Sequence, residues 1–161
     1  MTTTAAAAGG DATTWRGVDL SGLTVVLGAG TGQLVRVLEP QVTAADGQLL
    51  VVDPSAEVLQ ALAASGLSSK VTSVRARMRS VPVLADAADL TVLNGSLRQV
   101  PTSHLVKMAE EVWRLLTPGG RLRIADVIEP TDEGPEEAWR VRNEMVRTLA
   151  TAFGRSSALA V

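Results

Sequence analysis

A glycine-rich segment directly after a short apolar run most constrains the fold of this 161-residue chain. Residues 23–27 (LTVVL) are mostly apolar and partly β-branched, which is typical of a strand buried on both faces of a parallel sheet. Residues 28–32 (GAGTG) follow, and a helical pattern begins at Gln33. Glycine allows a sharp turn and lets a ligand approach the backbone without a Cβ in the way. Because parallel sheets bind ligands at the carboxyl ends of their strands, we favour a ligand-binding loop over a purely structural turn.

Strands and helices alternate along the rest of the chain. Apolar runs predict further strands at 48–52, 71–76, 89–93 and 121–125. Helical spacing predicts four helices, at 33–39, from Pro54-Ser55 to Gly66, from 102 or 103 to 116, and at 135–153. Pro118-Gly119-Gly120 should stop the third helix. The inner face of the fourth would consist of Trp139, Met145, Leu149 and Phe153. This order is typical of an α/β fold with a doubly wound, mostly parallel sheet and right-handed crossovers. Residues 15–161 should form one such domain, and residues 1–14, poor in large apolar groups, a flexible tail.

Asp53 is the most informative charged residue of the sequence. It ends the expected second strand, 21 residues after Gly32. An acidic side chain at this place can accept hydrogen bonds from both hydroxyls of a ribose. A helix-capping role ahead of Pro54 is the alternative. Together with the glycine loop, ribose binding is the better interpretation.

Composition excludes several classes of function. The chain has no cysteine and one histidine, His104, so neither a thiolate nor a multi-histidine metal site is expected. We interpret His104 as a solvated helix residue rather than a general base. The net charge of -2 and the few aromatic residues argue against nucleic-acid binding. No apolar run approaches the roughly 20 residues of a membrane helix, and no signal peptide is recognisable, so we expect a cytoplasmic protein with no membrane partner.

Four segments, in this order and spacing, resemble the class I S-adenosylmethionine (SAM) dependent methyltransferases. They are VVLGAGTGQL, GQLLVVDPS, DLTVLNGSLRQVP and EVWRLLTPGGRLRIADV, and the resemblance covers roughly residues 20–130. The small-molecule branch, which includes quinone-biosynthesis enzymes, is the most similar. The resemblance implies SAM as cofactor, a small-molecule substrate and a Rossmann-like methyltransferase fold, shortened at its carboxyl-terminal end. The G-x-G-x-G spacing agrees with SAM and disfavours an NAD-dependent enzyme.

The resemblance also implies a set of cofactor-binding residues and assigns no catalytic residue. Asp53 would hold the ribose, and the glycines would cradle the methionine portion. Asn94, at the end of the fourth expected strand, either lines the pocket or forms an Asn-Gly turn, and both interpretations stay open. The full set is Gly28, Ala29, Gly30, Gly32, Asp53, Pro54 and Asn94.

Two positions depart from the family pattern. Val26 stands where an acidic residue usually helps to hold the methionine end of SAM, and Arg77 stands where an acidic residue usually accepts from the adenine amino group. Losing one charged hydrogen bond typically costs about 1.5–3 kcal/mol. A second hypothesis is therefore a non-catalytic, methyltransferase-like binding or scaffold domain with weak or no SAM binding.

The carboxyl-terminal part of the sequence predicts that this chain associates with another chain. Methyltransferases of this class normally follow the fifth strand with a helix and an antiparallel pair of strands, whereas this chain ends at Val161. The strand at 121–125 would then present an unpaired edge, which is a template for pairing. We expect a homodimer, or a complex with a partner subunit, through this edge.

Overall fold

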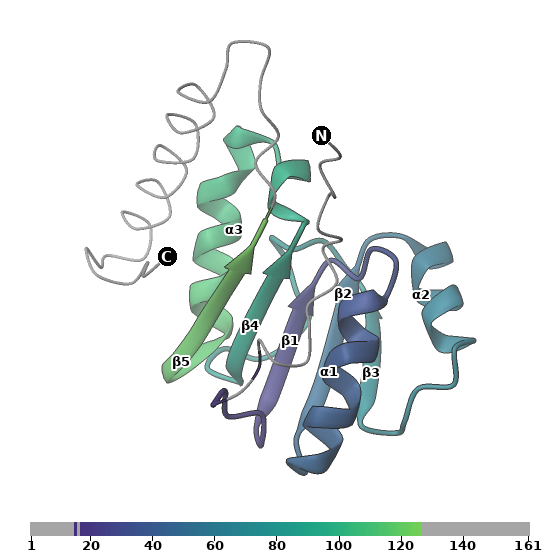
Figure 1. The fold of residues 1–161 in the computed structure, drawn as a ribbon. Helices are drawn as coiled ribbons and strands as arrows, with labels where there is room; N and C mark the ends of the chain where they lie inside the picture. The colour runs from purple at the N-terminus through teal and green to yellow at the C-terminus, as the bar shows by residue number, and fades with distance from the viewer. Residues whose placement is uncertain (1–14, 16, 127–161) are drawn as a thin grey trace, which may run out of the picture.

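The computed structural model describes Trp15 and residues 17–126, which form a five-stranded parallel sheet with helices on both faces (Figure 1). The strand order is β3-β2-β1-β4-β5. The elements are β1 (Leu23–Leu27), α1 (Gln33–Ala44), β2 (Gln48–Asp53), α2 (Ala56–Ala63), β3 (Val71–Arg75), β4 (Ala88–Asn94), the 3-10 turn η2 (Leu97–Gln99), α3 (Thr102–Leu115) and β5 (Leu116–Ala125). The predicted α/β class and the doubly wound parallel sheet are confirmed.

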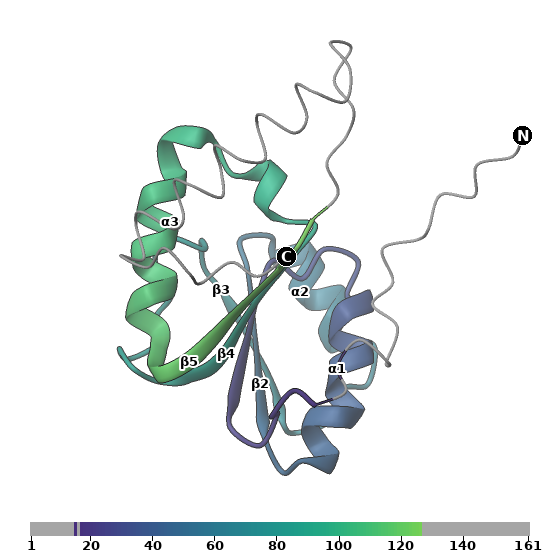
Figure 2. The same cartoon turned by 60° about the vertical axis from the view of Figure 1, so that its left-hand side comes forward.

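Helix α3 covers one face of the sheet, and α1 and α2 cover the other (Figure 2). An apolar core lies on each side of the sheet. Side chains alternate along β1, so that Val26 packs toward α1 and α2 while Val25 and Leu27 pack toward α3. All three are fully buried. Because every central strand is covered on both faces, its sequence is a continuous apolar run and not an alternating one.

Helix α1 is longer than the predicted 33–39 and contains Pro40 in its interior. An interior proline lacks an N–H and usually costs about 3 kcal/mol, so helices more often end before one. Val42, two residues after Pro40, is fully buried in the core between α1 and the sheet. Its burial, and that of Leu38, offset the missing hydrogen bond and keep the chain helical to Ala44.

The start of β5 also differs from the prediction. Helix α3 ends at Leu115, and β5 begins at Leu116, before Pro118-Gly119-Gly120. The pairing with β4 shifts here: Ala88 faces Leu116, but Leu90 already faces Arg121. The residues between form an irregular stretch in which Gly119 has a φ of 88°. The regular ladder begins at Arg121, the residue at which the strand was expected.

Trp15 marks the beginning of the described core. Its side chain is buried, and the guanidinium of Arg123 lies 4.3 Å from the centre of its ring. This contact joins the segment before β1 to β5. The tail 1–14, the helix expected at 135–153 and its four inner residues lie outside the described residues. Within the described chain β5 has only β4 as a neighbour, and association through this edge stays a prediction.

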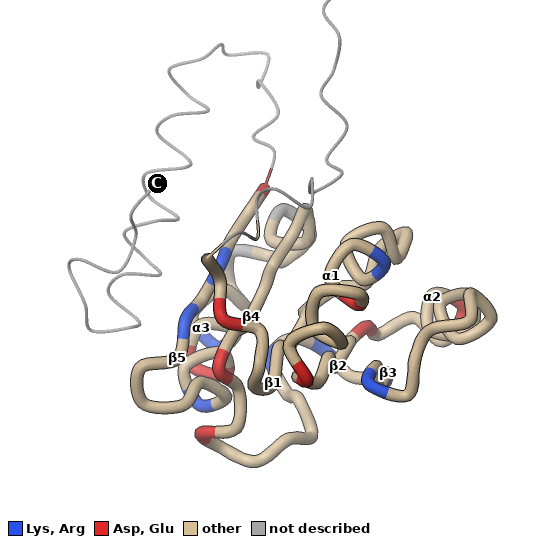
Figure 3. Tube along the Cα trace, turned by 60° about the horizontal axis from the view of Figure 1, so that its bottom comes forward, with Lys and Arg blue, Asp and Glu red and all other residues tan. Residues whose placement is uncertain are grey.

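Charges do not gather on one face of the described chain. Basic and acidic residues are interspersed along the trace (Figure 3). No described helix combines the length and the apolar character that crossing a membrane requires.

Candidate functional site

The glycine loop, residues 28–32, lies between β1 and α1 at the carboxyl end of the sheet. The N–H of Gly28 donates to the carbonyl of Val52 at 2.8 Å, and that of Gly32 donates to the carbonyl of Ala29 at 2.8 Å. Gly32 is the N-cap of α1, with a φ of 76°. Backbone hydrogen bonds therefore hold the loop at both ends, one to β2 and one within the loop.

Gly28 and Gly30 both have positive φ values but differ in what surrounds them. A Cβ at Gly28 would come 2.9 Å from Cβ of Ser96 and 3.0 Å from Cε of Met78. A Cβ at Gly30 would meet no atom within 4 Å, and Gly30 is exposed. Gly28 thus allows two side chains to approach the loop, whereas Gly30 leaves open space beside the backbone.

The carboxylate of Asp53 joins the glycine loop to the start of α2. Oδ2 accepts from the N–H of Ala29 at 2.9 Å, and Oδ1 accepts from the N–H of Ser55 at 2.8 Å. The N-cap of α2 is Ser55, whose hydroxyl accepts from the N–H of Val58, so the alternative of Asp53 as the cap does not hold. An ionised carboxylate has about four acceptor positions, and these two N–H groups use two of them. Asp53 is buried, with 7% of its surface exposed.

Ser96 and Met78 were not predicted as site residues. The Ser96 hydroxyl is buried and donates to the carbonyl of Leu27 at 3.0 Å, so it supports the end of β1. Met78 lies in the loop after β3 and places its methyl group over Gly28. Their only sequence signals are their positions after β4 and β3, and these do not reveal a contact with Gly28.

The remaining predicted positions are spread around this loop. Pro54 is exposed at the end of β2, and Asn94 is half-buried as the last residue of β4. Val26 is fully buried against α1 and cannot contact a ligand at the strand ends. The described residues contain no group of three potential metal ligands.

A cavity of about 450 Å³ opens at the carboxyl ends of β2, β3 and β4, and none of residues 28–32 lines it. Pro54 is one of its lining residues, and so is His104, which is half-buried here although the sequence suggested a solvated helix position. The full lining is Pro54, Arg77, Met78, Arg79, Gln99, Val100, Pro101, His104 and Met108. The sequence signal for this cavity was the segment 74–80 (VRARMRS), in which arginine occupies alternate positions at and after the end of β3.

An ion pair on α3 fixes the loop that carries these arginines. Glu111 accepts from the backbone N–H of Val81 at 2.7 Å and from Arg114 Nη2 at 2.7 Å. Arg114 also donates to the carbonyls of Val81 and Val83, at 3.0 and 2.7 Å. The guanidinium of Arg114 holds the pKa of the Glu111 carboxyl below its ordinary value, and the carboxylate raises the pKa of Arg114 in turn.

A family model described as "Methyltransferase domain" matches residues 25–120, more than half of the chain. The chain belongs to the methyltransferase domain family. The match begins in β1 and ends in the irregular start of β5, so it includes the glycine loop, Asp53 and the cavity. No curated protein matches this methyltransferase domain significantly by sequence.

Solved structures share the fold of this methyltransferase domain. A SAM-dependent methyltransferase from Aquifex aeolicus has a TM-score of 0.66 at 20% identity, over 82% of this chain and 73% of that chain. A SAM-dependent methyltransferase from Mesorhizobium loti has a TM-score of 0.57 at 24% identity, over 71% of this chain and 53% of that chain. The [4+2]-cyclase SpnF has a TM-score of 0.64 at 25% identity, over 81% of this chain and 49% of that chain. The chain thus spans only about half the length of several structures that it matches.

Proposed function

We propose that this chain is a SAM-dependent methyltransferase that acts on a small molecule, or the cofactor-binding subunit of one. The observation that carries this proposal is the hydrogen bond of 2.9 Å between the Ala29 N–H and the Asp53 carboxylate. It joins the two elements of the proposed cofactor site, the glycine loop and the acid after β2, into one rigid unit. The resemblance to the quinone-biosynthesis branch supports a small-molecule acceptor.

The residues present fit the cofactor. Asp53 and Pro54 would lie at the ribose, with the remaining acceptor positions of the carboxylate toward its hydroxyls. Gly28, Ala29, Gly30 and Gly32 would border the methionine portion, and Asn94 would border the site from the end of β4. Bound SAM supplies an activated methyl group, so the chain itself has mainly to orient the acceptor and exclude water.

A second candidate function is a non-catalytic binding or scaffold domain. Met78 places its methyl group directly over Gly28, so this side chain has to move before a ligand reaches that part of the loop. Val26, at a position that is usually acidic in the family, is apolar and buried. SpnF has the same fold and is named a [4+2]-cyclase, so the fold alone does not establish methyl transfer.

Thermal unfolding with and without cofactor tests the proposal. A ligand at 100 times its Kd stabilises the native state by about 2.7 kcal/mol. For a chain of this size we expect the Tm to rise by about 5–10 °C with saturating SAM or S-adenosylhomocysteine, its demethylated product. NAD at the same concentration should leave the Tm unchanged. Identical melts with and without either compound would reject the methyltransferase and favour the scaffold.

A further inference from the structure

The Met78 side chain contacts both parts of the proposed cofactor site. A Cβ at Gly28 would come 3.0 Å from Cε of Met78, so the methyl group of Met78 covers this glycine of the loop. The same side chain lines the cavity at the strand ends, as Pro54 does after β2. Gly30 differs, because a Cβ there would meet no atom within 4 Å. Met78 therefore covers one glycine of the loop and leaves the other open.

The backbone around Met78 forms a turn that is attached to the sheet. The N–H of Ser80 donates to the carbonyl of Arg77 at 3.0 Å, which closes the turn with Met78 as one of its two central residues. The N–H of Ala76 donates to the carbonyl of Asp53 at 3.2 Å, so the turn is joined to the end of β2 two residues before Met78.

Helix α3 holds the chain on the other side of the turn. The N–H of Val81 donates to the Glu111 carboxylate at 2.7 Å, and Nη1 of Arg114 donates to the carbonyl of Val83 at 2.7 Å. The backbone is thus held both before and after Met78. We therefore expect this residue to leave Gly28 by rotation of its side chain rather than by movement of the turn.

Of the two side chains that contact Gly28, Met78 is the one that can yield. The Ser96 hydroxyl is buried and donates to the carbonyl of Leu27 at 3.0 Å, which fixes that side chain. Met78 is half-buried at the margin of the core between α3 and the sheet, and its unbranched side chain has three rotatable bonds. The cavity of about 450 Å³ that it lines gives its methyl group room in a second rotamer.

We propose that Met78 is a gate on the cofactor site, an inference that rests on the proposed function. Its side chain packs on Gly28 in the ligand-free chain and turns away, along the wall of the cavity, when the methionine portion of SAM binds. Only chains with the gate open accept that portion, so the apparent affinity is the intrinsic affinity multiplied by the open fraction. A ligand that lacks the methionine portion does not require the gate to open.

Titration of the full chain with S-adenosylhomocysteine and with adenosine tests the gate. Met78→Ala should bind S-adenosylhomocysteine at least three-fold more tightly than the native chain, because no side chain has to leave Gly28. Its affinity for adenosine, which lacks the methionine portion, should not increase. Leu84→Ala is the control, since it shortens an exposed side chain in the same connection between β3 and β4 that does not line the cavity. This variant should bind both ligands like the native chain.

A second measurement uses the native chain and needs no variant to fold. With ¹³C in the methionine methyl groups, the nuclear Overhauser effect between the Met78 methyl and the α protons of Gly28 reports the closed gate. We expect this signal in the ligand-free chain. It should be lost on saturation with S-adenosylhomocysteine and kept on saturation with adenosine.

The outcomes separate the gate from the proposed function. Equal or weaker binding of S-adenosylhomocysteine to Met78→Ala, or a Met78 to Gly28 signal that persists in its complex, would reject the gate and leave the methyltransferase standing. An equal gain in affinity for adenosine would also reject it, because the substitution would then only enlarge the site. Binding of S-adenosylhomocysteine to Met78→Ala alone would support both proposals. If neither chain binds it, the proposed function fails and the gate fails with it.

Discussion

Replacement of Gly28 by alanine is expected to destabilise the chain by about 2–5 kcal/mol. A φ of 92° is unfavourable for any residue with a Cβ, at a cost of roughly 1–2 kcal/mol. The new methyl group would also come 2.9 Å from Cβ of Ser96, which cannot yield easily because its hydroxyl is bonded to the Leu27 carbonyl. Crowding of this kind in a packed site adds about 1–3 kcal/mol. Urea unfolding at neutral pH measures the difference.

Gly30→Ala is the matched control for this prediction. Gly30 also has a positive φ, 52°, but a methyl group there would meet no atom within 4 Å. Gly30→Ala should destabilise the chain only by the cost of the backbone conformation, about 1–2 kcal/mol. The new methyl group would occupy the space proposed for the methionine portion of SAM. Equal destabilisation by the two substitutions would show that the contact of Gly28 with Ser96 and Met78 has no importance for stability.

Glu111→Ala is expected to cost about 2–3 kcal/mol at pH 7. The substitution leaves the Val81 N–H without its acceptor and removes the charged partner of the half-buried Arg114, which keeps only the carbonyls of Val81 and Val83. Losing a charged partner is more costly than losing a neutral one. The neighbouring Glu110 is exposed and has no partner among the described residues, so Glu110→Ala should change the free energy of unfolding by no more than about 0.5 kcal/mol.

The contribution of Glu111 to the free energy of unfolding should decrease as the pH falls. Its pKa is lowered in the folded state, so the stabilisation is present above its ordinary pKa of 4.5 and is lost as the pH falls through the folded value. The gap in stability between the native chain and Glu111→Ala should therefore be constant from pH 6 to 8 and shrink below 4.5. A gap that grows on acidification would mean that the carboxylate does not stabilise the loop.

The sequence predicted the local features of the site well. The apolar run of β1, the glycine loop and the start of α1 are adjacent in the chain, and the same holds for β2 and Asp53. Each is specified by neighbouring residues, so periodicity and turn chemistry were sufficient. The predicted end of α1 was wrong, because the helix continues through Pro40 to Ala44. Burial of Val42 outweighs the destabilising effect of Pro40, and no local rule of sequence compares these two energies.

The contacts that define the cavity could not be predicted in this way. Ser96 bonds to Leu27 across 69 positions of sequence, and Glu111 bonds to Val81 across 30. Both depend on the strand order, which places β4 next to β1 and brings the loop after β3 against α3. The arginines of residues 75–79 were visible in the sequence, but only the fold shows that Arg77 and Arg79 line the same cavity.

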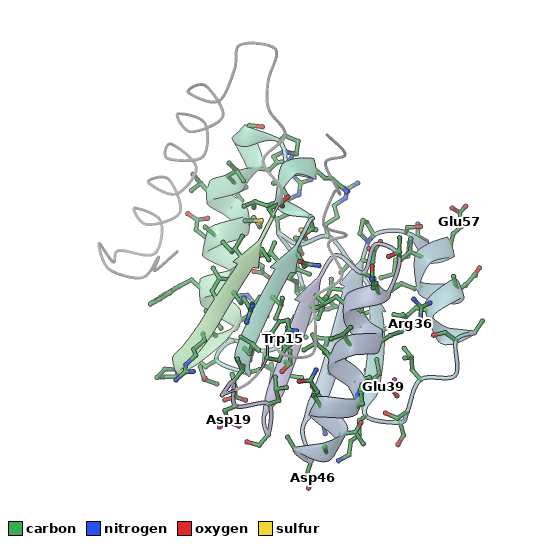
Figure 4. All side chains as sticks on the ribbon, viewed as in Figure 1. Trp15, Asp19, Arg36, Glu39, Asp46 and Glu57 are labelled. Atoms are coloured by element: carbon green, nitrogen blue, oxygen red, sulfur yellow. The ribbon has the colours of Figure 1, made fainter. Side chains whose placement is uncertain are left out.

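Calorimetric titration of the full chain with S-adenosylhomocysteine tests the central claim most directly. The account predicts saturable heat with one site per chain, and an affinity at least several-fold lower for Asp53→Asn. This change keeps the shape of the side chain but removes its charge and replaces one of the two oxygens that accept from Ala29 and Ser55 by a donor. Glu57→Gln makes the same change of charge on the exposed start of α2, where Figure 4 shows the side chain pointing outward, and should bind like the native chain. Absence of heat at millimolar ligand, or equal affinity in a folded Asp53→Asn variant, would contradict the account.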